Sequence, residues 1–436
     1  MRLIRRFVLL TPLLAGPAFA QDGPGAALWQ LMDEYNKWQL QESPQAAMRQ
    51  GDYSHADQVD EVGLAAIERR HAARQAFLKR LHDIDASKLN DEDGLNFALF
   101  NRELSQMVEG HRFRMFLAPL TNRSGIHTEV PEMGTFARFN SAEDYENFLR
   151  RLELVPGQID DTIELLQLGL KAGITPPAIA SQGLPEQVKA LSEDGLAALA
   201  EPFDRLPASV TAEQAALLRD RFDAVSLPRL KDAFAKLHGF LANDYMPNAR
   251  QTIAATDLPN GEAYYAFQLR RMTTTNLTAK EIHETGLREV ARIRAEMMDV
   301  IRRSDFMEKF PEAATWPEEE RFKRFVAYLR TDSRFYYDSP ETLLAGYRDI
   351  CKRIDAELPK LFGHLPRLPY GVRPIPDFMA PNQTTAYYNP GDIRNAQAGY
   401  FYANTYALDQ RPKYEMISLA LHEAVPGHHL QISIAQ

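Results

Sequence analysis

The sequence predicts a mostly α-helical protein, with one or more large helical regions and a short β-strand segment next to a helix that carries a histidine cluster. Along most of the 436-residue chain, apolar residues recur at the i, i+3, i+4 spacing of amphipathic helices. Proline-rich sequence and a run of β-forming residues are concentrated between residues 366 and 405. With 45% hydrophobic and 25% charged residues, the composition is that of a globular protein.

The first twenty residues have the pattern of a secretory signal peptide. Arginines precede an apolar stretch and an Ala-x-Ala cleavage pattern (Arg2, Arg5, Arg6, residues 7–14, Ala18 and Ala20). We therefore expect a periplasmic or secreted protein whose mature chain begins at Gln21. Cys351 is the only cysteine, so we expect neither a disulfide nor a lipid anchor. No later stretch reaches ~18 uninterrupted apolar residues, so we expect no stable membrane insertion.

Helical periodicity runs through most of the chain up to residue 358. The predicted helices are 26–50, 62–84, 91–109, 141–156, 158–173, 212–246, 278–303, 318–329 and 340–358. Ser141 and the Thr278/Glu281 pair are helix-start signals, whereas Pro156 is expected to end a helix. Residues 184–211 mix short helices with prolines. We expect one large domain, 21–436, with a possible sub-domain break near 184–211.

The character of the chain changes after Pro359. Six prolines predict an extended or turn-rich segment (Pro366, Pro369, Pro374, Pro376, Pro381 and Pro390). Residues 399–405 are rich in β-formers and predict a strand. Pro412 suits the first position of the helix that follows. The helix with the histidine cluster is therefore expected to lie behind a short strand.

Charge and motifs exclude several classes of function. The net charge of −9 argues against nucleic acid as a partner, because binding phosphates requires a basic surface. The sequence contains neither a Gly-x-Ser-x-Gly nucleophile motif nor a phosphate-binding Walker loop. A metal site is the remaining candidate.

Three histidines lie within eight residues near the C-terminus, where His422-Glu423 is followed by Pro426, Gly427, His428 and His429. A zinc hydrolase needs imidazoles to hold the metal and a carboxylate to take a proton from water. The usual helical motif places the second histidine four residues after the first, on the same face. Here that position is Pro426, and the residue seven positions on lies ~10.5 Å along a regular helix. A regular helix therefore does not close this site.

Pro426 and Gly427 offer a solution. Proline lacks the N–H of the helical hydrogen bond, and glycine tolerates unusual backbone angles. We expect the pair to bulge the helix and bring His428 to the place of the usual second ligand. The prediction is that His422 and His428 bind zinc and that Glu423 is the catalytic general base. His429 remains either a substitute ligand or a hydrogen-bonding residue behind the ligands. The alternative is a plain helix C-terminus, where the dipole favours cationic groups.

These residues resemble the bacterial "domain of unknown function 885" family, zinc metallopeptidases of the His-Glu zincin type. The matching stretch is 421–431, with weaker likenesses at 151–176, 281–287, 401–405 and 411–416. The resemblance implies an exported, mostly helical, zinc-dependent peptidase-like hydrolase, and it carries over His422, Glu423 and His428 as metal and catalytic positions. It also implies a third ligand, a glutamate, beyond Gln436. We therefore expect a chain truncated at its C-terminus, with an incomplete metal site.

Peptides are the expected substrates. By analogy with thermolysin-like enzymes, strand 399–405 would pair with the peptide, and Asn404 is the predicted substrate-binding residue. The other interpretation is an ordinary core strand. The competing function is a non-catalytic exported helical binding protein that uses the histidines to bind metal.

Overall fold

The computed structural model describes residues 23–376, 380–391, 393 and 397–436, and the predicted signal peptide lies outside them. The chain divides into two compact units, and the division falls between Ile282 and His283. We call the described residues 23–282 the N-terminal unit and residues 283–436 the C-terminal unit. Among the described residues, no helix is both long enough and apolar enough to cross a membrane.

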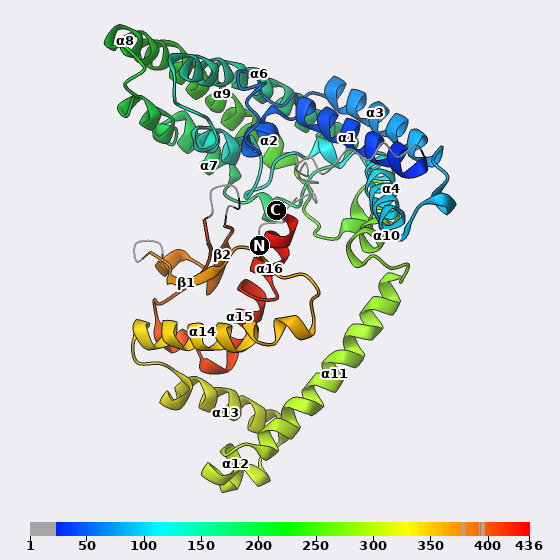
Figure 1. The fold of residues 1–436 in the computed structure, drawn as a ribbon, viewed down its shortest axis with the longest axis vertical. Coiled ribbons are helices and arrows are strands. Elements are labelled where there is room, and N and C mark those ends of the chain that lie inside the picture. The colour runs from blue at the N-terminus through cyan, green and yellow to red at the C-terminus, as the bar shows by residue number, and fades with distance from the viewer. Residues whose placement is uncertain (1–22, 377–379, 392, 394–396) are drawn as a thin grey trace. The chain divides into compact units, whose positions relative to one another are not determined.

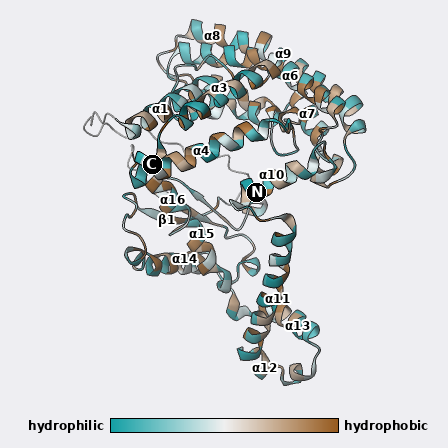
Figure 2. Ribbon diagram, turned by 90° about the vertical axis from the view of Figure 1, so that its right-hand side faces the viewer, coloured by the Kyte–Doolittle hydropathy of each residue, from teal (hydrophilic) through white to brown (hydrophobic). Residues whose placement is uncertain are grey.

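The N-terminal unit is built from helices packed against one another (Figure 1). Its helices are α1 (Pro24–Glu42), α2 (Pro44–Arg49), α3 (Leu64–His82), α4 (Asp91–His111), α5 (Ile126–Glu129), α6 (Ala142–Ala172), α7 (Leu184–Ser192), α8 (Ala212–Arg221), α9 (Leu227–Phe240) and α10 (Gly261–Thr273). Hydrophobic and hydrophilic residues alternate along helices such as α6 and α9 (Figure 2). This is the pattern of helices that bury one face and expose the other.

The expected sub-domain break near 184–211 falls inside the largest core of the N-terminal unit. Leu184, Val188, Leu199 and Phe203 from this segment are buried in the same cluster as the apolar faces of α6 and α9. Shared burial holds these residues in one unit despite the local prolines. The structure therefore places the division at Ile282 and His283 instead, within helix α11 (Ala279–Arg303).

Helix α6 continues through Pro156, where the sequence predicted a helix end. The helix runs unbroken for 31 residues from Ala142 to Ala172. Leu152, Val155 and Ile159 on either side of the proline are completely buried in one core. Burying this apolar stripe outweighs the loss of one backbone hydrogen bond at the proline.

The C-terminal unit combines helices with one small sheet. Besides α11, its helices are α12 (Phe306–Lys309), α13 (Glu318–Thr331), α14 (Pro340–Asp355), α15 (Met416–Glu423) and α16 (His428–Ala435), and its strands are β1 (Tyr370–Pro374), β2 (Ala386–Asn389) and β3 (Gly399–Ala403). Strand β3 lies in the centre, parallel to β1 and antiparallel to β2. The predicted class, mostly α with a short β-segment beside the motif helix, is confirmed.

The sheet supports the motif helix through one buried face. Burial alternates along β3, and Phe401 and Ala403 are fully buried against side chains of α14 and α15. The ring of Phe401 lies edge-on to that of Tyr347 on α14, with centroids 5.0 Å apart. Figure 1 shows α14 and α15 next to the strands. Residues 366–390 therefore hold two strands that the proline-rich pattern did not reveal.

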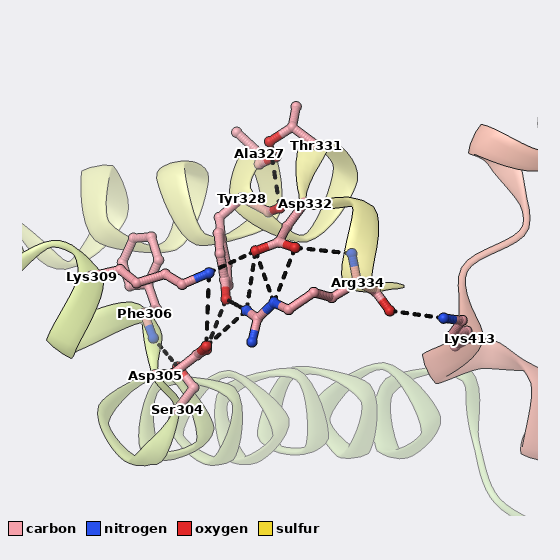
Figure 3. Close-up of polar contacts among 10 residues, drawn as sticks. All are labelled: Ser304, Asp305, Phe306, Lys309, Ala327, Tyr328, Thr331, Asp332, Arg334 and Lys413. Carbon is pink, nitrogen blue, oxygen red and sulfur yellow. Dashed lines mark hydrogen bonds and ion pairs between the residues drawn. The ribbon is translucent and has the colours of Figure 1, made fainter. Parts of the chain in front are cut away.

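A polar network links α12 and α13 to the segment that leads into α15 (Figure 3). The Arg334 guanidinium pairs with Asp305 at 2.7 Å and with Asp332 at 3.1 Å, and it also contacts the Tyr328 hydroxyl. Lys413 Nζ donates to the Arg334 carbonyl at 3.1 Å. These contacts hold the pKa of Asp332 well below its usual range, chiefly through Arg334. The network therefore ties the start of the motif helix to α13.

Replacing Phe401 with alanine should loosen the C-terminal unit. The substitution removes a fully buried ring at the centre of the sheet, which typically costs about 3–5 kcal/mol of unfolding free energy. Tyr400→Ala is the matched control on the same strand, because Tyr400 is only half-buried and stacks on Arg373, so its loss should be about 1 kcal/mol. Hydrogen exchange of peptides from residues 283–436 measures both effects, and equal losses would contradict this packing.

Candidate metal centre

The site is built where α15 stops and α16 starts. Helix α15 ends at Glu423 and α16 begins at His428, with a cis peptide bond between Val425 and Pro426. The amide of His429 donates across the break to the carbonyl of Ala424 at 3.0 Å. The sequence predicted a bulge within one helix, whereas the structure has two helices that meet at a sharp turn. This turn changes the face on which the later histidines lie.

Gly427 is required at this turn because the backbone passes very close to the end of α15. A Cβ atom at this position would overlap the carbonyl oxygens of His422 and Leu421. Any side chain would therefore push α16 away from α15. The glycine sets the separation between the two histidines that flank the turn.

The turn brings together His422, Glu423 and His428. One ligand atom from each lies within 4.8 Å of the others, and this is the one such group of three found among the residues that the structure describes. The two imidazole rings are nearly perpendicular, with centroids 4.8 Å apart. His428 Nε2 lies 4.0 Å from a carboxylate oxygen of Glu423. These are the three residues that the sequence predicted, in the predicted register.

The chemistry of this group fits zinc. Two imidazole nitrogens and a carboxylate oxygen are typical zinc donors. Two atoms bound to one ion at ~2.0–2.1 Å lie at most about 4.2 Å apart, so the 4.8 Å limit requires only a small inward movement. His422 is exposed and has room to make it. The described residues offer no further histidine, cysteine or carboxylate to this group.

Glu423 occupies an apolar environment that changes its acidity. Its side chain is buried, and burial raises the pKa of the carboxyl above its ordinary value, with a smaller opposing effect from His422. A carboxylate of raised pKa holds a proton more readily near neutral pH than an exposed one does. The group can therefore both accept and return a proton.

His429 belongs to the supporting structure. It is buried, and its Nδ1 lies 2.7 Å from the Tyr388 hydroxyl of β2 and 3.2 Å from Ser433 Oγ. The ring of Tyr370 on β1 packs beside it at 4.6 Å. Burial lowers the pKa of its imidazole, which favours the neutral form. His429 thus fixes α16 to the sheet, and its neighbour His428 lies with His422 and Glu423.

Asn404, the predicted substrate-binding residue, is buried and hydrogen-bonded to backbone groups of the protein itself. Its side chain is 1% exposed, and Nδ2 donates to the carbonyls of Ala380 at 2.9 Å and Thr384 at 3.1 Å. Its Oδ1 accepts from the amide of Tyr406 at 2.9 Å. The amide group is therefore occupied in holding the loop before β2 against the end of β3. This geometry argues against a role in binding substrate.

An apolar groove beside the motif was not foreseen from the sequence. It has a volume of about 360 Å³ and is lined mainly by side chains of α14, the residues after it and α15 (Ile350, Ile354, Leu358, Leu361, Ile417, Leu421 and Pro426). The four-residue spacing of these leucines and isoleucines is visible in the sequence. The same spacing is expected of buried faces, so the pattern alone does not separate a groove from a core.

Gly427→Ala should separate the two motif helices. The added methyl group would overlap the carbonyl of His422, and overpacking of this kind typically costs about 1–3 kcal/mol of unfolding free energy. Gly286→Ala is the matched control in the same unit, because nothing lies within 4 Å of its added Cβ, and it should stabilise helix α11 by roughly 0.5–1 kcal/mol. Denaturant unfolding of both variants measures the difference, and a neutral Gly427→Ala would refute the close approach.

Comparison with known proteins identifies the fold and the family. Two solved structures cover 94% of this chain and have TM-scores of 0.69 and 0.64, at 18% and 15% sequence identity. Each is described as a "putative lipoprotein", the first from Colwellia psychrerythraea and the second, "of unknown function", from Shewanella oneidensis. The present chain covers 72% of each. A search of curated proteins found no match.

The sequence profile described as "Bacterial protein of unknown function (DUF885)" matches residues 44–436. This match includes all of the C-terminal unit and almost all of the described N-terminal unit. The residues around the predicted metal centre lie within it. The chain therefore belongs to the DUF885 family.

Proposed function

We propose that this protein is an exported, zinc-dependent peptidase-like hydrolase. His422 and His428 would hold the metal, and Glu423 would act as the general base. The observation that carries the proposal is the convergence of two imidazoles and one buried carboxylate within 4.8 Å at the turn between α15 and α16. Two imidazoles that can hold zinc, beside a carboxylate that can take a proton from water, are an arrangement that zinc hydrolases use.

The chemistry divides between the metal and the chain. When bound, zinc would supply Lewis-acid chemistry that polarises a carbonyl and lowers the pKa of water. The Glu423 carboxylate takes a proton from the attacking water and delivers it to the leaving amine. Its burial, which raises the pKa of the carboxyl, favours the step in which it takes up the proton. The buried His429 keeps α16 in place throughout.

A peptide is the substrate class that this chemistry favours. Water that loses its proton to a carboxylate attacks a carbonyl carbon, and the same carboxyl then protonates the amine as the C–N bond breaks. Export is supported by the signal-peptide pattern of residues 1–20 and by the description of the two similar structures as lipoproteins. A periplasmic or secreted location is part of this proposal.

A second candidate is a non-catalytic metal-binding protein. Two observations favour it: His422 is exposed, and within the described residues the group includes only two imidazoles. Such a protein would use the same histidines but would not need Glu423 as a base. The two candidates therefore differ in what happens when Glu423 loses its charge.

Zinc content and peptide hydrolysis test the proposal on purified protein. His422→Ala and His428→Ala should each weaken zinc binding at least tenfold, because each removes one of two imidazole donors. His364→Ala is the matched control, an exposed histidine in the same unit, and it should keep the zinc content of the unaltered protein. Elemental analysis and competition with a chelator measure both. Equal zinc contents in all variants would contradict the proposed metal site.

Glu423→Gln separates catalysis from binding. Glutamine keeps the size of the side chain but cannot accept the proton, so turnover of a quenched-fluorescence peptide library should fall by roughly 10²–10⁴-fold. Zinc content should be unchanged. Loss of zinc with Glu423→Gln would assign the carboxylate to the metal instead. Unchanged turnover would refute Glu423 as the base, whereas no turnover by the unaltered, zinc-loaded protein would favour the second candidate.

A further inference from the structure

The N-terminal unit buries a positive charge without a matching negative one. Arg151 on α6 is 1% exposed, so its guanidinium is removed from solvent. Its one hydrogen-bonding contact among the described residues is from Nη1 to the Met48 sulfur at 3.5 Å, and its Nε has no hydrogen-bond partner there. A thioether sulfur is a weak acceptor and carries no charge. Burying an ion in this way is costly unless something compensates it.

The nearby carboxylates already accept hydrogen bonds from groups other than Arg151. Asp60 accepts from Ser43 Oγ at 2.6 Å and from the amide of Gln45 at 3.0 Å. Asp144 accepts from Arg138 Nε at 2.8 Å. Each carboxylate thus has its own partner, and neither forms an ion pair with Arg151.

The pKa of Arg151 is lowered because its guanidinium is buried without an ion-pair partner. Burial lowers the pKa of its guanidinium to about 10, and the more distant Asp60 only partly opposes the effect. The group nevertheless remains charged at neutral pH. The protein therefore retains a buried cation that its own side chains do not neutralise.

A small pocket adjoins this cation. Its volume is about 10 Å³, and its polar lining consists of Arg151, Tyr53, Asn147, Arg138 and the carboxylate of Asp144. About this much room holds one water-sized sphere. The phenol of Tyr53 and the amide of Asn147 can donate hydrogen bonds. Arg138 lies over the Tyr53 ring at 4.9 Å and is itself paired with Asp144. The lining thus combines hydrogen-bond donors, the Arg138–Asp144 ion pair, whose two charges offset each other, and the one uncompensated positive charge of Arg151.

We propose that this pocket is a binding site for a small inorganic anion of about the size of chloride, held by Arg151 between α2, the loop after it and α6. A water molecule would satisfy the hydrogen bonds but not the charge. A polyatomic organic anion is too large for the volume. The site is independent of the histidine cluster, which belongs to the C-terminal unit.

Thermal unfolding of the full chain tests the site, with potassium chloride exchanged against potassium gluconate at constant ionic strength. A bound anion stabilises the folded state by mass action, so the midpoint should rise by roughly 2 to 3 °C for each tenfold increase in chloride above its dissociation constant. Arg151→Met should abolish this response, because methionine keeps much of the bulk and removes the charge. Broadening of the ³⁵Cl resonance by the protein should disappear in the same variant.

Arg150→Met is the matched control. It removes the same charge one position away on α6, where Arg150 is half-exposed and pairs with Asp57, and it should keep the chloride response. If Arg151→Met does not fold, Tyr53→Phe, which deletes a proposed donor, should weaken the response. Three outcomes would overturn the proposal: no chloride response in the unaltered protein, the same response in Arg151→Met, or an Arg151→Met midpoint above that of the unaltered protein in saturating chloride.

Discussion

The candidate metal centre depends on the contact between two backbones at Gly427. Because this residue has no side chain, the start of α16 can lie against the carbonyl of His422 at the end of α15. That contact converts a sequence spacing unsuited to a regular helix into a group of three converging side chains. Without it, the imidazoles of His422 on α15 and His428 on α16 would not converge.

The small sheet gives this contact its rigidity. Helix α15 packs on the sheet through Met416 and Ala420, and α16 is attached through His429 to tyrosines on two different strands. Both helices of the motif are thus fixed to one support. The network around Arg334 adds a further attachment through Lys413, just before α15 begins. The three side chains of the site are therefore held by buried packing behind them and a surface network beside them.

Periodicity predicted much of this architecture, and its errors have physical reasons. Most helices were recognised because one apolar face repeats along them, and β3 was recognised from its aromatic run. A helix end was predicted at Pro156, but α6 continues through it. Burial of the apolar residues on both sides stabilises the helix more than the proline destabilises it. Strands β1 and β2 were hidden because their prolines lie at strand ends or between strands, where no ladder hydrogen bond is lost.

The site was predicted more fully than its surroundings. The sequence singled out His422, Glu423 and His428 by residue type, and the structure brings these three together, whereas the substrate-binding role of Asn404 rested on an analogy and its side chain is occupied by buried hydrogen bonds. The position of His429 was left open, because only the three-dimensional path of the turn decides which of two adjacent imidazoles faces the sheet. The uncompensated charge of Arg151 has no sequence signal, since it arises from what the neighbouring carboxylates already bind.

The turn at Pro426 and Gly427 also affects how such centres are found in genomes. A search for two histidines four residues apart on a continuous helix passes over this chain, although its donors converge in space. The informative signature is a His-Glu pair, a Pro-Gly interruption and a histidine six positions after the first. Insertion or deletion of one residue within the interruption would change the histidine that faces the centre. The length of this segment is therefore as diagnostic as the histidines themselves.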